Sequence, residues 1–143
     1  MNAIGFVYAA NMTNRLAIEI PENQWDKQLI TELGTLRKLF IHLIRVRDTY
    51  TEGLRKGTVS FPGVLPSKDI DIKDQLERST NELAGEFSNT NREVIRMGGE
   101  NLTILEFLNT TVQHEGVHQG QYFVALKQAG LTLPNQWINE WSM

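Results

Sequence analysis

The 143-residue sequence contains no cysteine. This excludes disulfide bonds, thiolate metal sites and a cysteine nucleophile, so any thiol chemistry must use a thiol that the substrate brings. The net charge is −3, and no run of Lys or Arg is dense enough to neutralise several phosphates. We therefore expect no nucleic-acid partner.

Long apolar runs are also missing. Asn11, Asn14 and Arg15 interrupt the N-terminal segment before about 18 apolar residues accumulate, and no basic region precedes it. We therefore expect a soluble cytoplasmic protein that does not associate with membranes. Hydrophobic residues make up 41% and charged residues 22% of the chain, as in ordinary globular proteins. The length fits one domain over residues 1–143.

Strand-like alternation does not persist anywhere in the chain, whereas apolar residues recur at helical spacing. The pattern predicts helices over residues 4–20 and 34–56, a third that starts at a cap on Ser67 or Asp69 and reaches Phe87, and a fourth over 104–128. The second has the most continuous apolar stripe: Leu36, Leu39, Phe40, Leu43, Val46, Tyr50 and Leu54. We therefore predict an all-α four-helix bundle.

The connections carry their own signals. Residues 88–99 are polar and end in Gly98-Gly99, which indicates a long connection with a short extended piece at 94–97. Thr103 and Glu106 form a capping-box signature at the start of the fourth helix, and Gly130 is its expected stop. The tail after Gly130 is too short for another domain, and we expect its tryptophans to pack across the bundle.

The three histidines of the chain are His42, His114 and His118. His114 and His118 are four residues apart, which places them about 40° from each other on one helix face, where two imidazoles can bind one ion. His42 lies at the edge of the apolar stripe of the second helix, where it can reach a groove shared with the fourth. We therefore predict that the three bind one divalent metal ion and leave a position open for water or substrate.

The alternative is that each histidine is an ordinary polar residue near the core or surface, which would be favoured for any lone helical histidine. The joint pattern favours metal binding. Imidazole suits several divalent metals. We expect zinc or nickel, with iron and manganese as alternatives.

Residues 114–118 also match H-E-x-x-H, the motif in which two histidines bind zinc and a glutamate activates water in peptidases. A third histidine six residues after the pair would be needed in one such class, but Val124 occupies that position. In another class the third ligand is a downstream glutamate, and only Glu140 remains, which we expect to lie outside any helix. A zinc peptidase is therefore disfavoured.

Glu115 and Gln121 are weak catalytic candidates. Helical geometry points Glu115 toward the bundle interior, where a carboxylate must be paired or protonated. A salt bridge to Arg45, Arg47 or Arg15 is favoured over a general-base role. Gln121 returns to the metal-facing side of its helix, where it could orient a ligand or a substrate.

Two segments carry a resemblance to a known family. The first is Leu39-Phe-Ile-His42-Leu with Asp48 and Tyr50, and the second is His114-Glu-Gly-Val-His118-Gln-Gly-Gln121, followed by Gly130, Leu133-Pro134 and Trp137. In these residues the chain resembles the DinB/YfiT-like family of metal-dependent four-helix-bundle proteins. It departs from the family pattern at Gln119, where histidine or arginine is usual.

The resemblance implies an up-down-down-up bundle, a three-histidine metal site and a homodimer. It also implies a thiol S-transferase that uses a low-molecular-weight thiol such as bacillithiol, mycothiol or glutathione, with a small-molecule substrate. A metal-dependent hydrolase and a non-enzymatic metal-binding or stress-response protein remain as alternatives. If the protein is an enzyme, we expect a substrate pocket beside the metal, lined by the loops after the second and third helices.

Overall fold

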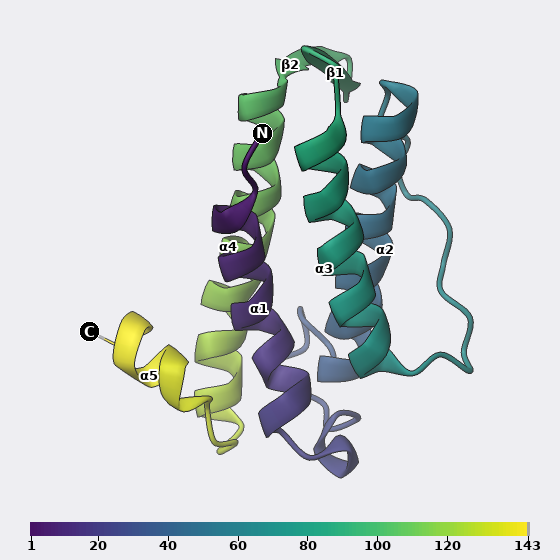
Figure 1. The fold of residues 1–143 in the computed structure, drawn as a ribbon. Helices are drawn as coiled ribbons and strands as arrows, with labels where there is room; N and C mark the ends of the chain where they lie inside the picture. Colours follow the sequence, from purple (N-terminus) through teal and green to yellow (C-terminus); the bar gives the residue numbers. More distant parts are fainter. Residues whose placement is uncertain (143) are drawn as a thin grey trace.

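The computed structural model describes residues 1–142, which form five α-helices, one 3-10 turn and two short strands. The long helices are α1 (Ile4–Glu19), α2 (Leu36–Lys56), α3 (Ile72–Asn89) and α4 (Ile104–Gln128). Figure 1 shows them side by side, with α1 and α4 running in one direction and α2 and α3 in the other. The fold is mostly helical, as the sequence predicts.

The helix ends follow local chemistry. The Thr35 side chain accepts a hydrogen bond from Lys38 N–H at the start of α2, and Gly57 ends that helix in the left-handed conformation. Thr103 and Glu106 form the predicted capping box of α4. Gly130 also adopts a positive φ, and Leu131 N–H bonds the Leu126 carbonyl, which closes α4 with a Schellman motif.

For the connections, one expectation is wrong and one is incomplete. The cap of α3 is Asp71, not Ser67 or Asp69, because the chain after Pro66 continues without helical structure and runs back along the bundle before α3 begins. The extended piece predicted at 94–97 is confirmed as β1 (Val94–Met97), but its pairing with β2 (Glu100–Thr103) in an antiparallel hairpin was not predicted. Gly98 and Gly99 both have positive φ and make its turn.

The tail forms a fifth helix, α5 (Asn135–Trp141), so Glu140 does lie in a helix. Trp137 is fully buried, and its indole N–H donates to the Met12 carbonyl at 2.8 Å. Trp141 is 47% exposed, so only one of the two tail tryptophans packs into the bundle. None of the helices within residues 1–142 is long and apolar enough to cross a lipid bilayer.

The core has two apolar halves separated by a polar layer. One half surrounds Trp25, Phe40 and Trp137, and the other surrounds Phe87 and Phe107. Between them, at the middle of each long helix, lie buried polar residues: Thr13 and Asn14 on α1, Arg47 on α2, Ser79 and Thr80 on α3, and Thr111 and Glu115 on α4.

The long helices do not pack equally closely. The backbones of α2 and α3, of α1 and α3, and of α1 and α4 are in close contact, whereas those of α2 and α4 approach less closely. The side between α2 and α4 is therefore bridged by side chains, and His42 lies on α2 while His114 and His118 lie on α4.

Candidate metal centre

The three histidines meet between α2 and α4 in the arrangement that the sequence predicts. The Nε2 atom of His42 lies 3.1 Å from that of His114 and 3.0 Å from that of His118, and the last two are 3.1 Å apart. Three ring nitrogens from two helices thus form a nearly equilateral triangle. Each residue offers one ligand atom to the same point.

The size of this triangle fits one metal ion. Nitrogen ligands about 2.0–2.1 Å from an ion lie about 2.9 Å apart at right angles and about 3.3 Å apart at tetrahedral angles. The observed separations of 3.0–3.1 Å fall between these values. Three nitrogens on one side of an ion leave its other side open, which distinguishes this geometry from a closed structural site.

The surroundings keep the imidazoles neutral, as metal ligands must be. Burial lowers the pKa of His114 to about 4, with a further contribution from His118. Burial also lowers the pKa of His42 and of His118. Gln121 lies beside His118, with its amide oxygen 3.0 Å from Nδ1. When Nδ1–H donates to this oxygen, the Nε2 lone pair of His118 points into the triangle.

Glu115 does not face the metal triangle. It is 1% exposed, and the Arg47 guanidinium donates from Nε to Oε1 at 2.8 Å and from Nη2 to Oε2 at 3.0 Å. Of the three predicted partners, Arg47 is therefore the observed one. Burial opposes ionisation of Glu115, but the charge and hydrogen bonds of Arg47 lower its pKa overall. A paired carboxylate of this kind is a poor general base.

Arg47 organises the polar layer of the core. Besides Glu115, its guanidinium donates to the side chains of Asn14 (2.9 Å), Thr80 (3.2 Å) and Thr13 (3.3 Å) and to the Leu76 carbonyl (3.2 Å). The Thr13 hydroxyl in turn donates to Glu115. The network therefore joins all four long helices.

Arg47 and Tyr50 are two further residues near the histidines that the sequence pattern does not mark as site residues. Arg47 lies within the apolar stripe of α2, between Val46 and Tyr50, and this position is the sequence signal that its charge is buried. The ring of Tyr50 lies 6.1 Å from that of His114, centroid to centroid. Burial and the negative charge of Glu115 raise the pKa of Tyr50 to about 12, so its hydroxyl stays protonated.

A pocket of about 330 Å³ opens beside the triangle. Its lining residues are Glu32, Leu33, Lys38, Leu39, His42, His118, Gln121 and Tyr122. The predicted pocket is therefore present, but the expected lining is wrong. The loops after α2 and α3 do not line it, because the connection between α1 and α2 supplies the residues beyond the two helices.

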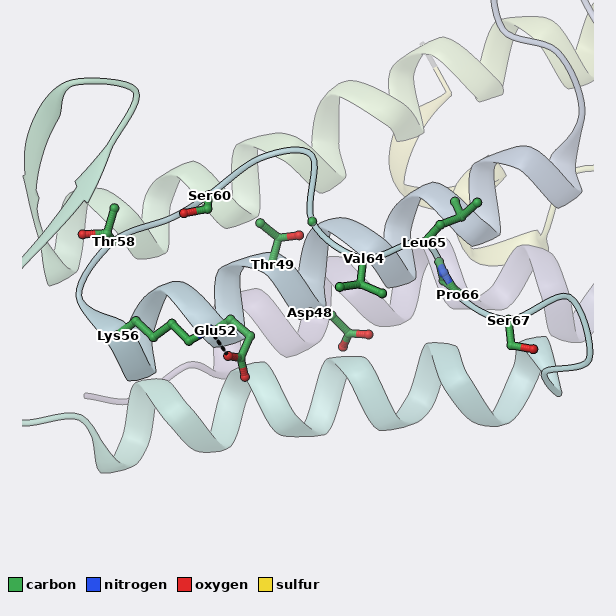
Figure 2. A pocket seen from close by; sticks show the side chains of 11 residues that line it. Asp48, Thr49, Glu52, Lys56, Thr58, Ser60, Val64, Leu65, Pro66 and Ser67 are labelled. Atoms are coloured by element: carbon green, nitrogen blue, oxygen red, sulfur yellow. Dashed lines mark ion pairs between the residues drawn. The ribbon is translucent and has the colours of Figure 1, made fainter.

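The connection after α2 lines a different pocket of about 460 Å³. Figure 2 shows Val64, Leu65 and Pro66 of this connection above Asp48 and Glu52 of α2. Both acids are already paired, Asp48 with Arg78 and Glu52 with Arg55 and Lys56. The lining of this pocket does not include the histidines.

The sequence model of the DinB family matches residues 5–140. The chain belongs to the DinB family. No curated protein matches it.

Among solved structures, a DinB-like protein from Bacillus subtilis is 21% identical with a TM-score of 0.72, over 92% of this chain and 94% of that chain. A DinB-like protein from Bacillus cereus ATCC 10987 is 19% identical with a TM-score of 0.68, over 90% of each chain. At these identities the two structures show that the DinB-family fold is shared.

The fold also accounts for Gln119, where this DinB-family chain departs from the expected pattern. Gln119 is buried, and its side-chain amide donates to the Ala9 carbonyl at 2.8 Å. The side chain thus joins α4 to α1, on a different face of α4 from His118. Gln119 does not line the pocket beside the histidines.

Proposed function

We propose that His42, His114 and His118 bind one divalent metal ion, with zinc or nickel preferred, and that this DinB-family protein is a thiol S-transferase. The observation that supports the proposal most strongly is the convergence of three Nε2 atoms within 3.1 Å of one another, from helices far apart in the sequence. A bound divalent ion supplies Lewis-acid chemistry that lowers the pKa of a coordinated thiol.

The residues of the chain prepare the site for this chemistry. A hydrogen bond from Nδ1–H of His118 to the Gln121 amide oxygen would leave Nε2 free for the metal, and burial lowers the pKa of all three imidazoles, which favours their neutral form. The pocket beside His42 and His118 gives a small thiol and its electrophilic partner access to the open side of the triangle. Tyr122, whose hydroxyl donates to the Leu33 carbonyl at 3.0 Å, fixes the wall of that pocket.

A hydrolase of the H-E-x-x-H type receives less support. Such a mechanism needs the glutamate beside the metal as a general base. In this chain the Glu115 carboxylate accepts hydrogen bonds from Arg47 and Thr13 inside the core. The thiol transferase, which needs no protein carboxylate at the metal, is the function we favour.

Elemental analysis tests the metal site directly. We expect one equivalent of a divalent metal per chain in the purified or reconstituted protein. The His114→Ala variant should retain little of this metal. Gln113→Ala is the matched control, since Gln113 is the exposed neighbour of His114 on the same helix. Absence of stoichiometric metal in the wild-type protein after reconstitution would contradict the proposal.

A separate assay tests the reaction. The metal-loaded protein should conjugate a model electrophile with a cellular thiol, and His114→Ala should lose this activity. Bacillithiol, mycothiol and glutathione should each be tried, together with a test ester and amide. Hydrolysis of the ester or amide without thiol conjugation would replace the transferase by a hydrolase, and neither activity in a metal-bound protein would favour a non-enzymatic role.

A further inference from the structure

The contact between α2 and α4 is made by side chains. The backbones of these helices approach less closely than those of the other neighbouring helices. At the histidines, His42 meets His114 and His118. Toward the hairpin end of α4, the ring of Tyr50 contacts that of Phe107 at 5.3 Å between centroids. The charged bridge between the two helices is Arg47 with Glu115.

The Arg47–Glu115 bridge lies close to the metal ligands in the sequence as well as in space. Glu115 directly follows His114 on α4, and Arg47 is five residues after His42 on α2. Both side chains are 1% exposed. Any shift or rotation of α4 against α2 that moves the bridge therefore moves the histidines by a similar amount.

The Arg47–Glu115 bridge tolerates only a small shift of α4 against α2, whereas an apolar contact between the helices would tolerate a larger one. Its two hydrogen bonds are parallel and charged, and the remaining guanidinium N–H groups are held by α1 and α3. A slip of one residue moves a helix by about 1.5 Å along its axis, which is enough to break such a bidentate pair. The broken pair would leave two buried charges without their counter-charges, which is strongly unfavourable.

We propose that Arg47 and Glu115 are positioning residues that fix the register of α4 against α2 and thereby hold the three histidines at metal-binding distance. The inference rests on the proposed metal site. It gives the carboxylate of the H-E-x-x-H sequence a function that requires neither contact with the metal nor proton transfer. The apolar halves of the core supply burial, and the bridge between them selects one alignment of the ligand-bearing helices.

The test removes the bridge without leaving a buried charge. In Arg47→Leu/Glu115→Leu both partners become apolar, a change that often preserves stability. The matched control is Arg78→Gln/Asp48→Asn, which removes another bidentate pair of α2, one that joins it to α3 (3.0 and 2.8 Å). Two readouts are measured: Co²⁺ affinity with its visible spectrum, and, without metal, the distance between spin labels on Lys56→Cys and Gln113→Cys. The absence of native cysteine makes this labelling specific.

We expect the double leucine variant to fold, to bind Co²⁺ about 10–100-fold more weakly with a changed spectrum, and to show a broadened or shifted label distance. The control should keep the wild-type affinity, spectrum and distance. Wild-type values in the double leucine variant would overturn the inference and leave the metal site standing. If the wild-type protein binds no Co²⁺, the metal proposal fails, whereas the label distances still test whether the bridge sets the helix register.

A second variant covers the case in which the leucine pair does not fold. Arg47→Lys keeps the positive charge beside Glu115 but cannot form the two parallel hydrogen bonds. We expect a folded protein by circular dichroism whose Co²⁺ affinity is reduced at least several-fold with an altered spectrum. Unchanged affinity and spectrum would show that the bidentate geometry is not needed.

Discussion

The Arg47–Glu115 pair provides a sharp test of how the core is stabilised. Glu115→Gln preserves the shape of the side chain but removes its charge and replaces one acceptor oxygen by a donor. The oxygens of Glu115 accept from Arg47 at 2.8 and 3.0 Å and from Thr13. Breaking a buried pair by removing one partner costs about 3–5 kcal/mol, because the other charge stays buried without compensation. Domains are stable by only about 5–15 kcal/mol, so the loss is a large fraction of the total.

The measurement is urea unfolding of the metal-free protein at pH 7, followed by fluorescence of the buried Trp25 and Trp137. The midpoint should fall with an unchanged m-value, and the melting temperature should drop by about 10 °C. Glu52→Gln is the control, since Glu52 pairs with Arg55 and Lys56 at 3.0 and 3.1 Å but is half exposed. An exposed pair contributes about 0–1 kcal/mol. A loss below about 1 kcal/mol in Glu115→Gln would refute the reasoning.

The pH dependence of the same variant gives an independent check. The pKa of Glu115 is lower in the folded protein than in the unfolded chain. Its contribution is therefore fully present above the ordinary glutamate pKa of about 4.3 and is lost as the pH falls through the lowered folded value. The stability difference between wild type and Glu115→Gln should shrink on acidification, and a difference that grew instead would contradict the assigned direction.

Three further predictions concern the histidines and the tail. Gln121→Leu should weaken metal binding about 10–100-fold by releasing the tautomer of His118, whereas Gln113→Leu should not change it; equal affinities in a metal titration would remove the assigned role. Burial lowers the pKa of His114 to about 4, so between pH 7 and pH 5 the unfolded chain takes up a proton that the folded protein does not. The free energy of unfolding of the metal-free protein should therefore fall by about 1–2 kcal/mol between these pH values. Denaturant titrations at both pH values measure this loss, which should be smaller in His114→Asn. Trp137→Ala should cost about 3–5 kcal/mol of unfolding free energy and Trp141→Ala less than about 0.5, since only the first is buried; similar losses in calorimetry would show that α5 is not anchored as described.

The histidine triangle could be predicted because most of it is local. The four-residue spacing of His114 and His118 fixes their common face once the segment is helical, and His42 lies at the edge of a long apolar stripe. The sequence limits the salt-bridge partner of Glu115 to Arg45, Arg47 or Arg15 but does not decide among these three. The choice depends on tertiary contacts: Arg45 turns to the Gly63 carbonyl of the connection after α2, and Arg15 pairs with Glu19 at the surface.

The missed features depend on contacts between distant segments. Residues 94–97 could be recognised as extended, but their pairing with 100–103 needs Gly98 and Gly99 to act as a hairpin turn, and the same glycines are equally compatible with a loop. The start of α3 depends on the length of extended chain needed to run along the bundle from the end of α2. The possible capping residues do not by themselves determine this length. The pocket lining depends on the fold of the segment before α2.

The open side between α2 and α4 determines how the molecule can come apart. In order of close backbone packing the long helices form a series α2, α3, α1, α4, so its two ends are held together by side-chain bridges such as Arg47–Glu115 and not by close backbone contact. An ion held by residues 72 positions apart would add a further link between those ends and so strengthen the closure of the series into a ring. In a chain without cysteine, this is the role that a disulfide takes in other proteins. Metal binding should therefore slow hydrogen exchange most strongly along the facing sides of α2 and α4, where local opening is easiest.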